Sequence, residues 1–162
     1  MRRALAVLLL AAGCSRDAAP PPGAAVYTPR DRSFSFHAPE DWRVLEDQGG
    51  THRVTLFGPG GQAIAVHRHV EGDPRGYLLG AAMGSKRATP PEEGEISGRK
   101  TLTTTVERAM PGLHGGRAVS TVEKRVVVVD RGGFWVFTRT TGAGQPVDEA
   151  PFELVLRSFK AR

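Results

Sequence analysis

Residues 126–137 of the chain read VVVVDRGGFWVF, with an apolar run on either side of Asp130-Arg131-Gly132-Gly133. The middle four residues are typical of a tight turn, because aspartate hydrogen-bonds to nearby backbone and glycine adopts positive φ angles without steric cost. The segment therefore predicts a β-hairpin in which residues 126–129 face residues 134–137. Because the returning run is apolar throughout, both faces of that strand are expected to be covered, which places this hairpin in the middle of a sheet.

Outside this hairpin, several segments alternate between apolar and polar residues with the period of a strand. Residues 33–39 place Phe34, Phe36 and Ala38 on one face. A second hairpin is predicted where residues 58–61, which read GPGG, join two such segments. The further strands are expected at residues 42–44, 53–57, 62–70, 100–107 and 118–129. Residues 89–94 and 111–116 are expected to be polar loops.

Two helices are predicted, one within the chain and one near its end. Asp73-Pro74 supplies a capping side chain followed by a proline at the first helical position, so a helix is expected from there to Met83. The second helix is predicted by four apolar residues at helical spacing, namely Phe152, Val155, Leu156 and Phe159. Since strands and helices segregate along the chain, the fold class is α+β, with a mostly antiparallel sheet flanked by helices in an α/β/α sandwich.

The first 13 residues have the order of a secretory signal peptide: a charged start, a short apolar run and a stretch of small residues. The apolar run is too short to cross a membrane, which needs about 20 apolar residues. Residues 10–14 read LAAGC and resemble the lipobox of bacterial lipoproteins, although Ala11 stands where leucine is usual. We therefore expect Cys14 to be acylated. The alternative is an ordinary signal peptide cut nearby, which would leave Cys14 as a free thiol.

Acylation of Cys14 predicts the domain organisation. Residues 1–13 form the signal peptide, and residues 14–25 form the lipidated cysteine and a flexible tether rich in proline and alanine. Residues 26–162 form one domain without cysteine. The protein is expected in the bacterial cell envelope, facing the periplasm. Ser15 after the cysteine is compatible with the outer membrane, because it is not the aspartate that retains lipoproteins at the inner membrane of enteric bacteria.

The charge pattern argues against a nucleic-acid partner. The whole chain has 22 basic and 17 acidic residues, and removal of Arg2 and Arg3 with the signal peptide leaves a net charge of +3. These charges alternate in sign along the chain, whereas nucleic-acid binding needs a basic stripe. The expected partners are the membrane, through the lipid anchor, and a protein.

One strand carries the sharpest candidate for chemistry. His67, His69 and Glu71 are two residues apart, so all three side chains lie on one strand face and are candidate ligands of zinc or manganese. The alternative is that the two histidines are ordinary hydrogen-bonded residues of a sheet. We expect no cofactor other than this divalent metal.

The motifs of common enzymes are missing from the sequence. It contains no G-x-S-x-G, H-E-x-x-H or P-loop pattern. The pattern formed by Gly58, Gly60 and Ala63 formally matches a dinucleotide fingerprint, but a strand follows it where that motif needs a helix. Trp42 and Trp135 are expected in the core. We therefore predict no catalytic residues and no enzymatic activity.

The two ends of the expected domain resemble the PsbP-like superfamily. Residues 34–42, which read FSFHAPEDW, are similar to its opening pattern F-x-F-x-x-P-x-x-W, and Ser158-Phe159 is similar to the end of its closing helix. The resemblance implies a central antiparallel sheet flanked by helices. It also implies a role in binding or scaffolding, since the superfamily includes photosystem II subunits, a nuclear Ran-binding protein and bacterial lipoproteins without shared catalytic residues. The hypothesis is a non-enzymatic envelope lipoprotein, and the alternative is a metal- or small-ligand-binding protein that uses the face of His67 and His69.

Overall fold

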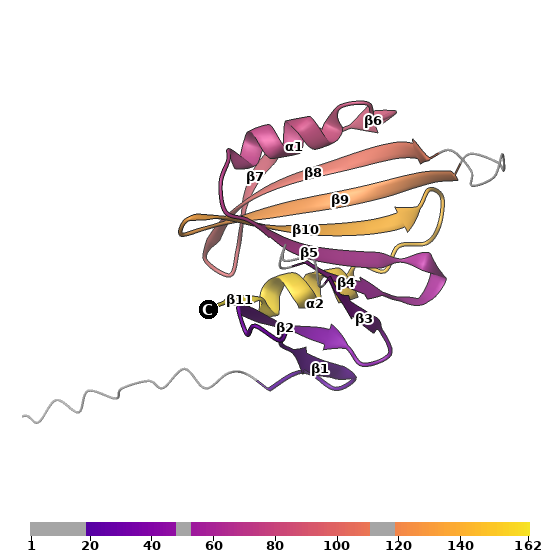
Figure 1. Cartoon of the computed structure of the whole chain (residues 1–162). Helices are drawn as coiled ribbons and strands as arrows, with labels where there is room; N and C mark the ends of the chain where they lie inside the picture. Colours follow the sequence, from indigo (N-terminus) through magenta and orange to yellow (C-terminus); the bar gives the residue numbers. More distant parts are fainter. Residues whose placement is uncertain (1–18, 48–52, 111–118) are drawn as a thin grey trace, which may run out of the picture.

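The computed structural model describes residues 19–47, 53–110 and 119–162. Within these residues the strands pair antiparallel and form a large and a small sheet (Figure 1). The order in the large sheet is β3-β4-β5-β10-β9-β8-β6, and β7 also pairs with β8. Its strands are β3 (Arg43–Glu46), β4 (Val54–Phe57), β5 (Ala63–His69), β6 (Arg87–Ala88), β7 (Glu92–Ile96), β8 (Arg99–Met110), β9 (Val119–Asp130) and β10 (Gly133–Gly142).

The predicted central hairpin is confirmed. Strands β9 and β10 pair with Val129 opposite Phe134 and Val126 opposite Phe137. β10 also pairs with β5, so it lies in the middle of the sheet. Its position explains why every residue from Phe134 to Phe137 is apolar, because each face of this strand contacts a different part of the core.

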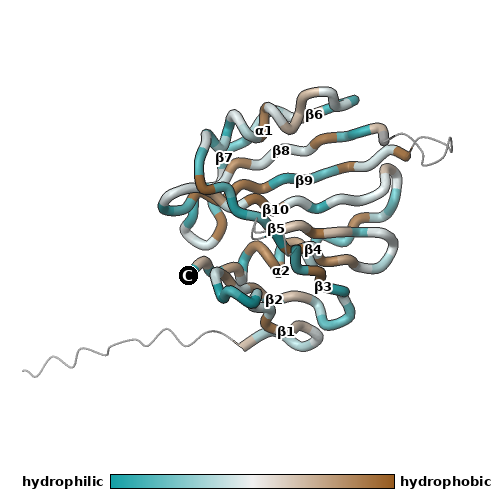
Figure 2. Tube along the Cα trace, viewed as in Figure 1, coloured by the Kyte–Doolittle hydropathy of each residue, from teal (hydrophilic) through white to brown (hydrophobic). Residues whose placement is uncertain are grey.

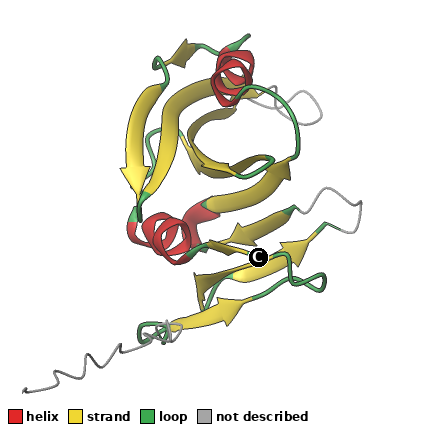
Figure 3. Ribbon diagram, turned by 90° about the vertical axis from the view of Figure 1, so that its left-hand side faces the viewer, coloured by secondary structure: helices red, strands yellow, loops and turns green. Residues whose placement is uncertain are grey.

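Both faces of the large sheet are covered, as predicted. On one face, Leu78 of helix α1 (Pro74–Ala82) packs with Val127, Phe134 and Val136. On the other face, helix α2 (Ala150–Ser158) joins Trp135, Phe137 and the small sheet in the larger core cluster. Figure 3 shows the large sheet strongly curved, with α2 between it and the small sheet. Figure 2 shows hydrophobic segments on α2 and, alternating with more polar ones, along the strands of the large sheet.

The small sheet has the order β1-β2-β11 and lies below α2 (Figure 1). Phe34 and Phe36 in β2 (Phe34–Pro39) are fully buried, which confirms the face predicted from their alternation. Strand β1 (Ala24–Tyr27) begins two residues before the expected domain boundary at residue 26. The third strand is β11 (Lys160–Ala161).

The helices begin and end close to the predicted residues. Asp73 accepts hydrogen bonds from the backbone N–H groups of Arg75 and Gly76, so it caps α1 as predicted. In α2, Phe152, Val155 and Leu156 are buried, and Phe159 is buried directly after the last helical residue. Neither these helices nor any other in the described ranges is long and apolar enough to cross a membrane.

The glycines near residue 58 form the connection of the second predicted hairpin. Strands β4 and β5 are joined through a short 3-10 turn, Pro59–Gly61, and pair with Leu56 opposite Ile64. A side chain at residue 58 would collide with the ring of Trp42, which explains the glycine there. Trp42 and Trp135 are both buried, as expected.

Two expectations from the sequence are wrong. Residues 92–96, of which the first three were expected in a polar loop, form β7, because pairing with β8 outweighs the low strand preference of glutamate and glycine. The strand expected over residues 62–70 ends earlier, because β5 ends at His69 and Val70, beyond it, is 66% exposed. The loop expected at residues 111–116 lies outside the described residues.

Candidate functional site

The face of the large sheet next to α1 contains a cleft with a volume of about 720 Å³. His67 and His69 reach it from β5, whose alternation turns both side chains away from buried Ile64 and Val66. Glu71 lines the same cleft just beyond the end of the strand. We call this feature the His67 cleft. Its other side chains include those of Arg53, Tyr77, Glu123 and Arg125.

The aromatic rings of the cleft pack against one another. The His69 ring stacks on Phe134, with ring centres 4.9 Å apart and an interplanar angle of 8°. The Tyr77 ring lies 4.6 Å from that of His69, and the His67 ring lies 5.0 Å from it. These contacts join α1 to β5 and β10, so the histidine rings contribute to packing on this face.

A chain of polar contacts crosses the same region. The Tyr77 hydroxyl oxygen lies 3.2 Å from Nε2 of His67 and accepts a hydrogen bond of 3.3 Å from Nη1 of Arg125. A guanidinium group can only donate, so the hydroxyl proton is free to point at Nε2 of His67. In that arrangement the neutral ring of His67 carries its proton on Nδ1, which is buried and has no hydrogen-bond partner.

The contacts continue from Arg125 to a shared carboxylate. Arg125 donates from Nε and Nη2 to Oε2 of Glu123, at 3.1 and 2.6 Å. The same oxygen lies 3.5 Å from Nε of Arg108. All three side chains are more than two-thirds buried, so the carboxylate between two guanidinium groups holds Arg125 in place beneath Tyr77.

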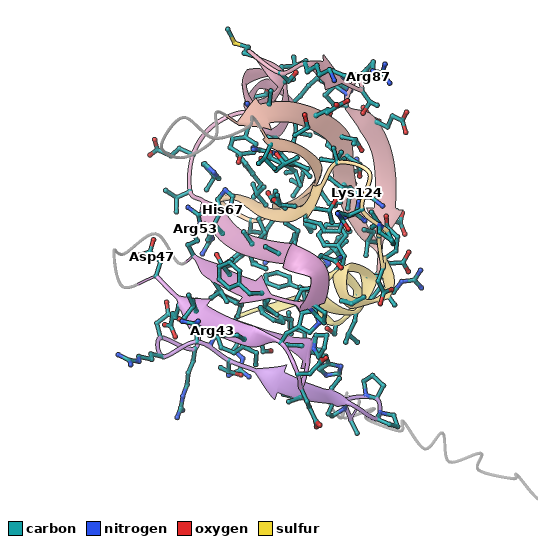
Figure 4. All side chains as sticks on the ribbon, turned by 90° about the vertical axis from the view of Figure 1, so that its right-hand side faces the viewer. Arg43, Asp47, Arg53, His67, Arg87 and Lys124 are labelled. Atoms are coloured by element: carbon teal, nitrogen blue, oxygen red, sulfur yellow. The ribbon has the colours of Figure 1, made fainter. Side chains whose placement is uncertain are left out.

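His67 is neutral at pH 7. Burial, and after it the positive charges of His69, Arg53 and Arg125, together lower its pKa from 6.5 to about 4. Figure 4 shows Arg53 beside His67 on one side of the molecule. A general acid or base works best with a pKa near the ambient pH, so His67 is poorly suited to either role near neutrality.

The geometry bears directly on the predicted metal ligands. Within residues 19–47, 53–110 and 119–162, no group of three or more His, Cys, Asp or Glu side chains is placed to hold a metal ion. His67 and His69 are neighbours, and Glu71 lines the same cleft. Nε2 of His67 faces the Tyr77 hydroxyl and Nδ1 is buried, so both ring nitrogens are blocked in this arrangement.

The sequence pointed to the histidines but not to their polar partners. Tyr77 comes from α1, Arg125 from β9 and Arg53 from the position directly before β4, and only the strand register brings them to His67. A partial signal was present, since Glu123 and Arg125 lie two apart in a strand otherwise rich in valine. Cys14, the predicted site of acylation, lies outside the described residues.

Several solved structures are similar to this chain. A Bacteroides thetaiotaomicron protein is 14% identical with a TM-score of 0.62, covering 86% of this chain and 49% of that one. The Ran-binding protein Mog1p of Saccharomyces cerevisiae is 10% identical with a TM-score of 0.55, covering 85% and 95%. The cyanobacterial PsbP protein (CyanoP) of Synechocystis is 16% identical with a TM-score of 0.48, covering 86% and 93%.

This chain therefore spans about half the length of the Bacteroides protein. No protein-family model and no curated protein sequence matches the chain.

Proposed function

Because this domain has the PsbP-like fold, we propose that the chain is a lipid-anchored protein of the bacterial cell envelope that binds a partner protein through the His67 cleft. It has no catalytic activity in this proposal. Cys14 carries the lipid, and the mature domain faces the periplasm, at the outer membrane in the simplest reading of Ser15.

The anchor is supported by the sequence. The only cysteine of the chain follows an apolar run and three small residues, where a lipoprotein signal peptide would be cut. Residues 15–25 with their three consecutive prolines are suited to a spacer, which at about 3 Å per residue holds the domain roughly 30 Å from the bilayer. Strand β1 at Ala24 shortens this spacer by two residues.

The observation that carries the binding role is the position of the Tyr77 hydroxyl between His67 and Arg125. Tyr77, Arg125 and Glu123 are hydrogen-bonded in series, and the described contacts do not pair a nucleophile with a base of suitable pKa. A cleft with fixed polar groups can orient a bound partner, and its rim of exposed side chains can contact that partner. Mog1p, which shares the fold, is a Ran-binding protein, and this supports protein recognition on such a scaffold.

The test is site-specific photocrosslinking in intact cells. A benzophenone amino acid replaces Val70, which lines the cleft and is exposed, and in a control it replaces Val129, which is exposed outside the cleft. We expect a discrete adduct from position 70 alone, and its loss when Arg53→Glu reverses a charge at the cleft. Equal adducts from both positions, or none from position 70, would contradict the proposal.

Catalysis is tested with the purified mature protein. We expect no turnover of small esters, peptides or phosphate esters. Turnover that one point substitution in the cleft abolishes would identify an enzyme and overturn the proposal.

A further inference from the structure

Strand β7 leaves one edge open among the described residues. It pairs with β8 from Glu92 opposite Thr103 to Ile96 opposite Arg99, and no second neighbour is present within the described strands. Ser97 and Gly98 form the connecting two-residue turn, with φ angles of 52° and 75°. Residues that flank such a turn form a hydrogen-bonded pair, and hydrogen-bonded and non-bonded pairs then alternate. The backbone N–H and C=O groups of Glu93 and Glu95 therefore point away from β8.

A groove lies between β7 and α2, on the face of the sheet opposite the His67 cleft. Its volume is about 830 Å³. Ile96 packs against the core cluster that contains Phe152, so the alternate residues Glu92 and Gly94 face the same side. Figure 4 shows Lys124, which lines this groove, on the opposite side of the molecule from His67. The floor is apolar and includes Val126 and Leu156.

The groove carries a surplus of negative charge. Four glutamates line it, at positions 92, 93, 95 and 153, together with Lys124 and Arg157. Both cations are already paired, Lys124 with Glu149 at 3.3 Å and Arg157 with Glu153 at 3.0 Å, and Glu93 is paired with Arg75 at 3.1 Å. Glu92 and Glu95 are exposed and form no ion pair within the described part of the chain.

We propose that this groove binds an extended basic segment of a partner protein, which adds a strand to the open edge of β7. The exposed edge supplies backbone donors and acceptors for a new strand, the apolar floor accepts alternate side chains, and the glutamates select lysine or arginine at the others. The negative charge of the groove is opposite in sign to the net charge of +3 of the mature chain. The preference for a basic segment is therefore a property of the groove and not of the protein as a whole. The groove shares no lining residue with the His67 cleft, so this inference goes beyond the proposed function and adds a second binding surface.

The experiment uses the purified mature protein and three labelled peptides. The first peptide alternates lysine and valine over ten residues, and the second alternates glutamate and valine. The third is the first peptide with every third residue replaced by proline. We expect the first peptide to bind and the other two to bind at least tenfold more weakly, because the second has the wrong charge and prolines cannot complete a strand. Fluorescence anisotropy at low salt measures the affinity.

Two double variants distinguish binding of the peptide in the groove from general electrostatic attraction of the peptide to the protein surface. Glu92→Lys/Glu95→Lys should weaken the first peptide at least tenfold, whereas Glu40→Lys/Asp41→Lys, with the same charge change at an exposed turn, should weaken it less than twofold. Amide hydrogen exchange at Glu93 and Glu95 should slow on binding. Equal weakening by both double variants, or equal binding of the proline peptide, would overturn the inference.

The results of the peptide experiment and of the crosslinking experiment can be distinguished from each other. If no peptide binds but the crosslink from Val70 persists, this inference fails and the proposed function stands. If the peptide binds as expected but the crosslink is absent, the His67 cleft is not the binding surface and the groove remains.

Discussion

The hydroxyl oxygen of Tyr77 lies 3.2 Å from Nε2 of His67, and this contact joins α1 to the large sheet at the bottom of the cleft. Around it, aromatic rings make the contacts that hold the helix in place. Arg125 approaches the same hydroxyl from β9, so three elements meet at one oxygen atom. The arrangement keeps a neutral imidazole next to a guanidinium, which is stable only while His67 stays unprotonated.

We predict that the stability of the protein falls as the pH decreases from about 6.5 to 4. Burial lowers the pKa of folded His67 to about 4, while the unfolded chain has the ordinary value near 6.5. Between these values the unfolded state binds more protons, so protonation favours unfolding. We expect protonation of this residue to lower the free energy of unfolding by about 1–3 kcal/mol over this pH range, allowing for partial solvent screening.

Urea unfolding at a series of pH values measures this effect in the wild type and in His67→Gln. In His67→Gln, the free energy of unfolding should depend less on pH between 6.5 and 4 than it does in the wild type. A His67 titration midpoint near 6.5 in proton NMR would show that the ring is not held neutral.

Removal of the Tyr77 hydroxyl should destabilise the protein modestly. Tyr77→Phe keeps the ring contacts with His69 and Phe134 but leaves Nε2 of His67 and Nη1 of Arg125 without their shared partner. We expect a loss of about 1–2 kcal/mol in the free energy of unfolding. Leu79→Ala on the exposed side of the same helix is the control and should cost less than about 0.5 kcal/mol. Equal losses would mean that the hydroxyl contact contributes nothing.

Two neighbouring glycines should differ sharply in their tolerance of alanine. Both have positive φ, 73° at Gly132 and 148° at Gly133, but a side chain at residue 133 would collide with the backbone carbonyl of His69, whereas residue 132 has open space. We expect Gly133→Ala to cost more than about 2 kcal/mol and Gly132→Ala about 1 kcal/mol. Thermal unfolding compares them, and similar melting temperatures would contradict the close approach of β10 to His69.

The central hairpin and the closing helix were predictable because their signals are local. Residues 126–137 contain both the turn and the apolar runs it joins, and the register follows once the turn is placed. In α2 the spacing of Phe152, Val155 and Leu156 identifies the buried side without knowledge of the rest.

The cleft and β7 were not predictable in this way. Tyr77, Arg125 and Arg53 meet His67 through pairings between distant strands, and period-2 alternation says nothing about which strands are neighbours. Strand β7 is rich in glutamate and contains glycine, so its local preference opposes the structure that pairing with β8 stabilises.

Zinc titration should not distinguish the wild type from His67→Ala/His69→Ala. Nε2 of His67 faces Tyr77 and Nδ1 is buried, so binding would require the ring to leave its contacts. Isothermal calorimetry with zinc, and separately with manganese, measures the affinity of both proteins. Binding by the wild type at least tenfold tighter than by the double variant would contradict this prediction and support a metal site at these histidines.

Membrane attachment through Cys14 is the claim on which the proposed role depends, and metabolic labelling with alkyne-tagged palmitate tests it directly. Wild type and Cys14→Ser are expressed with the full signal sequence and separated into membrane and soluble fractions. We predict that the wild type carries the label and sediments with membranes, whereas Cys14→Ser is unlabelled and does not sediment as a lipoprotein. An unlabelled wild-type protein in the soluble fraction would contradict the account.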